Sequence, residues 1–178
     1  MALAFLSVNA LLRLSRYSEK TNDTADNCCN IVLESQRTPY TARLPGEKEN
    51  PMNHAQGSFT VDVRPLSPAP AEGIGRFSIN KTIHGDLEAT TKGEMFTSGD
   101  PKKGLAGYVA IEFVTGTLNG KQGSFALQHF ATMDGRGPNM QVITVPGSGT
   151  GELAGIEGKF TIRIENREHF YDFEYALP

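Results

Sequence analysis

The chain has 178 residues, a formal net charge of −3 and a sequence pI of about 5.8. This length is sufficient for one domain with a buried core. The sequence has no basic stripe, which argues against a nucleic-acid partner, and no apolar run long enough to span a membrane. Only Gly46 of the 19 glycines precedes Gly57, so the composition divides the chain into two parts.

Residues 1–51 are predicted to form a disordered extension outside the domain, because residues 21–51 are polar and aperiodic. The apolar start resembles a signal peptide only weakly, since no positive region precedes it. Its Arg, Ser and Leu content is also compatible with a transit peptide. We also hypothesise that the natural chain begins at Met52, because Lys48-Glu49 can be encoded by a bacterial ribosome-binding sequence.

Both cysteines, Cys28 and Cys29, lie in this extension. Neighbouring cysteines rarely bridge each other, because a disulfide needs Cα atoms farther apart than adjacent residues place them. The glycine-rich part therefore has no disulfide framework. This composition fits a reducing compartment, and we expect the protein to be cytoplasmic.

After Gly57, short segments of alternating or apolar residues are separated by Gly, Pro and Asn, which is typical of strands and turns. Strands are predicted at Gly57–Arg64, Arg76–Ile83, Asp86–Thr97, the two arms of Tyr108–Asp134, Met140–Val145, Lys159–Ile164 and His169–Tyr175, with a glycine bend at Gly147–Gly151 that leads into Glu152–Glu157. About eight strands without a convincing helix predict an all-β domain over residues 57–178. We expect a single antiparallel barrel, lipocalin-like in outline, rather than a sandwich, because closure removes exposed edges.

The segment Tyr108–Asp134 is predicted to be one long hairpin, because Asn119-Gly120 is a strong turn signal between two β-rich runs. A two- or four-residue loop there makes the numbers of paired residues sum to an odd value. Side chains alternate between faces along a strand. Tyr108, Glu112 and His129 then share one face, with Glu112 opposite or diagonal to His129. An odd-length loop would place Gln128 beside Glu112 instead.

The other face of this hairpin is also apolar, with Val109, Ile111, Phe113, Ala126 and Phe130. Apolar residues on both faces suggest a curled sheet whose exterior is covered. A partner subunit is the simplest cover, so we expect a homodimer.

Three kinds of functional site are not supported by the sequence: a phosphate loop, a metal site and a nucleophilic serine. A phosphate loop needs a helix and a following Lys-Ser/Thr pair, whereas Gly147–Gly151 is surrounded by strands. The four histidines show no metal-ligand spacing, so no metal or other cofactor is expected. The serines lack a nucleophile-elbow context, which argues against a covalent hydrolase.

Glu112 and His129 admit two interpretations. A buried carboxylate and imidazole can simply satisfy each other. They can also form a proton-transfer pair in an apolar lumen, where burial tunes both groups. Tyr108 would add a hydroxyl donor on the same face.

The phrases EFVTGTLNGKQGSFALQHFATMD, VPGSGTGELAGIEGKF and YDFEYAL resemble a bacterial domain-of-unknown-function family over roughly Gly57 to Leu177. The resemblance includes the pair Gln128-His129 and implies a barrel like that of allene oxide cyclase. It implies no reaction, and that enzyme's site residues cannot be matched here one by one.

Two functions therefore remain open. The first is a binding module, or a cofactor-free isomerase or cyclase, for a small apolar molecule, with Tyr108, Glu112, Gln128 and His129 as candidate ligand-binding residues. The second is a structural or interaction protein with a filled barrel that oligomerises. An eight-stranded barrel is just wide enough for either.

Overall fold

The computed structural model describes residues 50–178. The strands are β1 (Asn53–Pro65), β2 (Ile74–Gly85), β3 (Leu87–Asp100), β4 (Leu105–Leu118), β5 (Lys121–Asp134), β6 (Gly137–Thr144), β7 (Thr150–Gly151), β8 (Glu157–Glu165) and β9 (Glu168–Ala176), with a 3₁₀ turn at Pro101–Lys103. β1 begins at Asn53, four residues before the predicted start of the first strand. The predictions for residues 1–49 lie outside the described residues, and a start at Met52 stays a hypothesis.

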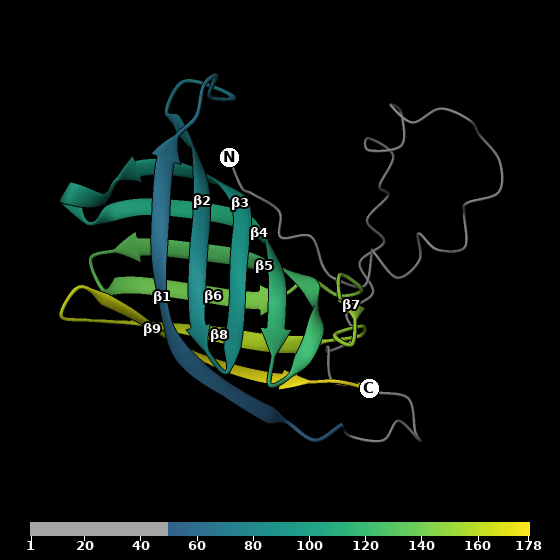
Figure 1. The fold of residues 1–178 in the computed structure, drawn as a ribbon. Helices are drawn as coiled ribbons and strands as arrows, with labels where there is room; N and C mark the ends of the chain where they lie inside the picture. Colours follow the sequence, from purple (N-terminus) through teal and green to yellow (C-terminus); the bar gives the residue numbers. More distant parts are fainter. Residues whose placement is uncertain (1–49) are drawn as a thin grey trace, which may run out of the picture. The chain divides into compact units, whose positions relative to one another are not determined.

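Eight long strands close into an antiparallel barrel, which confirms the predicted fold class. Their order is β4-β3-β2-β1-β9-β8-β6-β5, and pairing between β4 and β5 completes the ring. The seam between β6 and β8 is thin, since its register consists of the single pair Ile143↔Lys159. Figure 1 shows β1 and its neighbours crossing in front of the strands on the far side of the barrel.

The long hairpin has a two-residue turn, which is one of the two loop lengths that the predicted parity allows. Leu118 pairs with Lys121, and all paired numbers along β4 and β5 sum to an odd value. Asn119 and Gly120 have φ angles of 46° and 80°, as a turn with two left-handed residues requires. The predicted parity is therefore correct.

The segment that follows the predicted glycine bend contains only a two-residue strand and a turn. Only Thr150 and Gly151 pair with β5, as the two-residue strand β7. Residues 152–155 then form a turn. The turn is anchored because Leu153 and Ile156 pack into the barrel core, where each is about 1% exposed.

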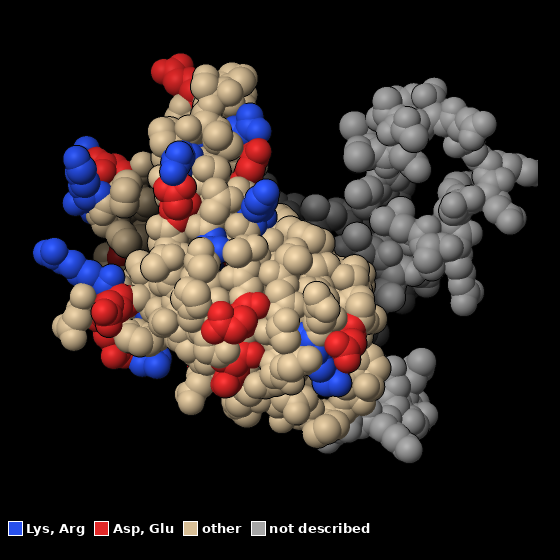
Figure 2. Space-filling view, in the orientation of Figure 1, with Lys and Arg blue, Asp and Glu red and all other residues tan. Residues whose placement is uncertain are grey.

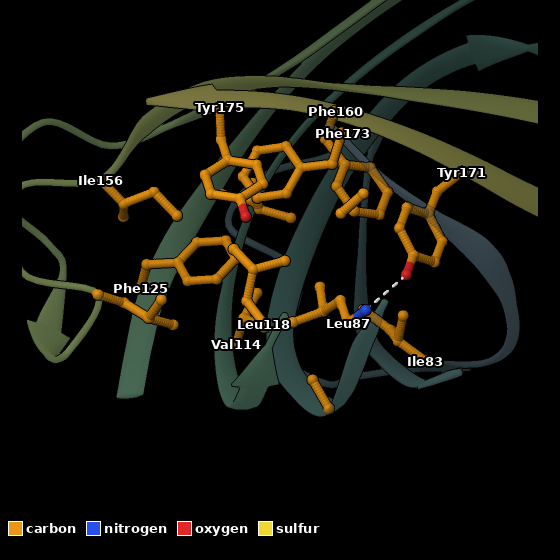
Figure 3. Packing of buried hydrophobic residues seen from close by; sticks show 14 of the residues in the cluster. Ile83, Leu87, Val114, Leu118, Phe125, Ile156, Phe160, Tyr171, Phe173 and Tyr175 are labelled. Carbon is orange, nitrogen blue, oxygen red and sulfur yellow. Dashed lines mark hydrogen bonds between the residues drawn. The ribbon is translucent and has the colours of Figure 1, made fainter. Parts of the chain in front are cut away.

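One half of the lumen is filled by stacked aromatic rings, which we call the aromatic half (Figure 3). Phe160 stacks on Tyr171 with ring centroids 4.9 Å apart, and Phe125 stacks on Phe173 at 5.7 Å. The Tyr171 hydroxyl accepts a 2.9 Å hydrogen bond from the Leu87 amide. Burial is the main cause that raises the pKa of Tyr171 to about 12, so this phenol stays neutral at physiological pH.

The outer surface has mixed charge on the face shown in Figure 2, where basic and acidic side chains alternate without forming a continuous stripe. The part of the chain from residue 50 onward contains no helix that could cross a membrane.

Candidate functional site

The candidate site is centred on Glu112, in the middle of β4. Its side chain points into the lumen, on the same face of β4 as Val114 and Ala110. Val114 lies on the side of the aromatic half and Ala110 on the other side. Glu112 has no exposed surface. Burying a carboxylate is costly unless it is paired and hydrogen-bonded, so its partners define the site.

The first partner is Lys81 of β2. Its ammonium donates a 2.6 Å hydrogen bond to Glu112 Oε2, and only 3% of the Lys81 side chain is exposed. Lys81 Nζ also lies 5.2 Å from the centroid of the Phe59 ring. Two buried isoleucines, Ile79 and Ile83, share its face of the strand. The ammonium is therefore held by one carboxylate and one aromatic ring in an apolar setting.

The second partner is His129 of β5, whose Nε2 lies 3.1 Å from the same oxygen, Glu112 Oε2. His129 pairs across the hairpin with Ala110 and Glu112 with Leu127, so the two side chains meet on the diagonal. Because a carboxylate only accepts hydrogen bonds, Nε2 donates, and Nδ1 is left as the acceptor in the neutral ring.

The backbone makes room for this cluster at two places. Gly93 pairs with Glu112, and a Cβ at residue 93 would lie 2.3 Å from the Ile111 carbonyl oxygen. The ladder between β2 and β3 omits Lys81, whose amide donates instead to Thr91 Oγ1 at 2.9 Å. The Thr91 hydroxyl then makes a long contact of 3.5 Å to Glu112 Oε1.

Burial and charge act in opposite directions on the two ions. Burial is the largest influence on Glu112 and raises its pKa, but hydrogen bonds and charges from His129 and Lys81 outweigh it, and the net pKa is lowered. Burial is also the largest influence on Lys81 and lowers its pKa, which the Glu112 carboxylate only partly offsets. Glu112 is therefore held as a carboxylate beside an ammonium that gives up its proton more readily than usual.

Every buried side-chain nitrogen and oxygen atom in the described residues has at least one hydrogen-bond partner. The capacity of the cluster is nevertheless not exhausted. An ammonium has three N–H donors, and Lys81 directs one of them to a hydrogen-bond acceptor within the described residues. The cluster therefore carries more donors than it uses.

At the end of the barrel away from the aromatic half, which we call the mouth, the inward-facing side chains are partly exposed: Phe77, Met95, Tyr108, Met133 and Met140. The Tyr108 hydroxyl donates to the Met140 thioether at 3.2 Å, and the Tyr108 and His129 rings are 6.5 Å apart. A thioether is a weak acceptor, so this hydroxyl is easily redirected. Burial, followed by the charge of Glu112, raises the pKa of Tyr108.

Three of the four residues predicted from the sequence meet on one face of the hairpin: Tyr108, Glu112 and His129. Gln128 does not join them, because strand alternation places it on the exposed outer face of β5. The sequence reasoning missed Lys81 and Thr91. A signal for Lys81 was present, since a lysine occupies the position between Ile79 and Ile83 where the pattern requires an apolar side chain.

No group of three or more His, Cys, Asp and Glu side chains in residues 50–178 is arranged to hold a metal ion. The polar cluster consists instead of one cation, one anion and one imidazole. Its chemistry is that of hydrogen bonding and proton transfer.

Comparison with known proteins identifies a family but no activity. The model of the family described as "Protein of unknown function (DUF3224)" matches residues 55–175. A solved structure of a DUF3224-family protein of unknown function from Shewanella oneidensis MR-1 is 42% identical, with a TM-score of 0.65. The match covers 72% of this chain and 99% of that chain. No curated protein matches the sequence.

Proposed function

The chain belongs to the DUF3224 family, whose function is unknown, and we propose from its own residues that the barrel binds a small, mostly apolar molecule in the half of the lumen toward the mouth. The polar end of this ligand lies against Lys81, Glu112 and His129. The ligand's apolar part contacts the side chains of the mouth. Ligand pockets are usually apolar with a few convergent polar groups.

One observation carries this proposal: a lysine and a glutamate, 3% and 0% exposed, form an ion pair inside an apolar lumen. Such a pair contributes little to stability, because desolvation of both ions offsets their attraction. Ionisable groups with perturbed pKa values in an apolar interior are common at functional sites. The position of the pair between the packed aromatic half and the mouth supports a role in binding.

The same geometry supports proton transfer, as in a cofactor-free isomerase or cyclase. Glu112 orients His129 through Nε2, which leaves Nδ1 to accept a proton from a bound molecule. The free N–H donors of Lys81 would stabilise negative charge that develops on a ligand oxygen. Glu112 itself is a poorer base, because its pKa is lowered.

Metabolite capture from a bacterial lysate tests the binding proposal. The immobilised wild-type domain is expected to retain a metabolite that mass spectrometry identifies. Glu112→Gln keeps the side-chain shape but removes the charge, and should lose that metabolite. Gln128→Ala, on the outer face of the same hairpin, is the matched control and should retain it. Equal retention by all three proteins would refute the proposal.

The outer face of the barrel favours a second candidate function, an interaction module that self-associates. Six large apolar side chains project outward there from neighbouring strands and are about a third to a half exposed: Phe96, Val109, Ile111, Phe113, Phe130 and Ile143. We call this set the outer apolar face. Contiguous patches of this kind commonly mark interfaces.

A second copy of the chain fits this face. Its margin on β3 carries Lys92 and Glu94, and its margin beyond β6 carries the cross-strand pair Lys159 and Glu174. Each margin thus carries one lysine and one glutamate, so two copies related by a two-fold axis would have opposite charges available on both margins. Light scattering is expected to find a dimer, and Ile111→Lys should convert it to a monomer. A strict monomer at high micromolar concentration would rule this candidate out.

A further inference from the structure

The barrel wall has a lateral groove between β1 and the β8–β9 hairpin. β1 pairs with β9 only as far as Phe59↔His169, and β1 then continues alone on that side to Pro65. The hairpin turns at Asn166 and Arg167, and its tip projects beyond β1 in Figure 1. The space between the two is a groove of about 450 Å³.

This groove ends next to the buried ammonium. Its lining includes Phe59 and Val61, which point inward, and His169. The Phe59 ring lies 5.0 Å from the His169 ring and 5.2 Å from Lys81 Nζ. Val61 is the direct cross-strand neighbour of Lys81. A single layer of side chains, Phe59 with His169, therefore separates the groove from the site.

We propose that this lateral groove is the entrance to the Lys81 site and that it admits a neutral carbonyl compound, an aldehyde or ketone with an apolar body. The inference rests on the proposed binding function and adds to it the route and the ligand class. The ligand passes Phe59 and Val61 on its way in. Its carbonyl oxygen then accepts from the N–H donors of Lys81 that have no acceptor among residues 50–178, and its apolar body contacts the side chains of the mouth.

The charges around the site favour a neutral ligand. Glu112 already balances Lys81 inside the lumen, so a carboxylate ligand would add an uncompensated negative charge. At the rim of the groove, Arg167 and Glu168 are both exposed and have opposite charges, so the rim attracts neither sign. Lys81 has N–H donors without an acceptor among residues 50–178. An oxygen that accepts suits these donors, and a carbonyl group supplies one without charge.

Reductive alkylation with benzaldehyde and cyanoborohydride tests both parts of the inference. Benzaldehyde and a lysine amine form an imine with loss of water, and hydride from cyanoborohydride reduces the imine to a secondary amine. Peptide mapping by mass spectrometry gives the rate at each lysine. We expect Lys81 to be modified in the folded protein at a rate comparable to that of exposed Lys92, although the Lys81 side chain is 3% exposed.

Two variants locate the route. His169→Ala widens the groove and should speed modification of Lys81 several-fold without changing the rate at Lys92. Met133→Ala widens the mouth by a similar change and should leave both rates unaltered. Unfolding free energies of the two variants, measured in urea, correct for any access through transient unfolding.

The outcomes separate the two claims. If Met133→Ala accelerates the reaction at Lys81 and His169→Ala does not, the ligand enters through the mouth and the lateral entrance is wrong, while the binding function stands. If Lys92 reacts and Lys81 stays unmodified in all three proteins, the lumen is closed to carbonyl compounds, and the lateral entrance and the ligand class both fail, while metabolite capture decides the binding function separately.

Discussion

Lys81 Nζ lies 2.6 Å from Glu112 Oε2 inside the barrel, with both side chains almost fully excluded from solvent. The two residues come from β2 and β4, so the contact reaches across β3. Coulomb attraction is strong in such a setting, but the cost of removing both ions from water is comparable. A substitution of only one member of the pair should therefore lower the stability of the fold, because it leaves the other ion buried and unpaired.

Removing the cation alone should be severely destabilising. Lys81→Met leaves the Glu112 carboxylate buried beside His129 without its ammonium partner. We expect a loss of about 3–5 kcal/mol in the free energy of unfolding, measured by urea titration. Lys92→Met, on the exposed face of β3, is the control and should change stability by no more than about 0.5 kcal/mol. Equal effects of the two substitutions would show that Lys81 is solvated.

Removing the imidazole should have a smaller effect. His129→Ala deprives Glu112 Oε2 of one donor and is expected to cost about 1–3 kcal/mol, as for an unsatisfied buried polar group. Replacing His129 and Glu112 together by apolar residues should not recover this loss, because Lys81 would then be buried without its carboxylate partner. The neighbouring substitution Gln128→Ala should be close to neutral. A His129→Ala effect within about 0.5 kcal/mol would mean that the ring is exposed.

The acid limb of stability should depend on Glu112. Its pKa is lower in the folded state than in the unfolded chain, so the unfolded chain binds more protons between the two values and stability rises with pH there. The contribution is complete above the ordinary carboxyl pKa of about 4.3 and is lost as pH falls through the folded value. Urea titrations from neutral pH downward should give a flatter acid limb for Glu112→Gln than for the wild type. Parallel curves for the two proteins would contradict this.

Tyr108 should matter for a ligand more than for the fold. Among residues 50–178, its hydroxyl has only the Met140 thioether as a partner, at 3.2 Å, and Tyr108 lies at the mouth. Tyr108→Phe is therefore expected to change the unfolding free energy by no more than about 0.5 kcal/mol and to weaken retention of the captured metabolite. A large loss of stability with unchanged retention would assign the hydroxyl a structural role.

The long hairpin shows what the local sequence pattern can predict of the site. Asn119-Gly120 set the turn, the turn set the register, and strand alternation then placed Tyr108, Glu112 and His129 on one face. These three steps need only neighbouring residues. The same alternation placed Gln128 outside, although it is adjacent to His129 in the sequence.

Lys81 could not be assigned to the site in this way. Its membership depends on which strands are neighbours and on where β2 lies against β3 and β4, which is decided by closure of the whole barrel. The division of the lumen into an aromatic half and a half whose inward-facing side chains are partly exposed has the same origin. It requires the registers of all eight strands, and no single segment contains that information.

The double variant Lys81→Met/Glu112→Leu tests the central claim most directly. Replacing a buried ion pair by apolar residues of similar size is often neutral or stabilising, so this protein should fold with at least about the stability of the wild type. The deciding measurement is the amount of lysate metabolite that each folded protein retains. The binding account predicts that the wild type retains it and the double variant does not. Equal retention by both proteins would contradict the account and leave the ion pair a purely structural element.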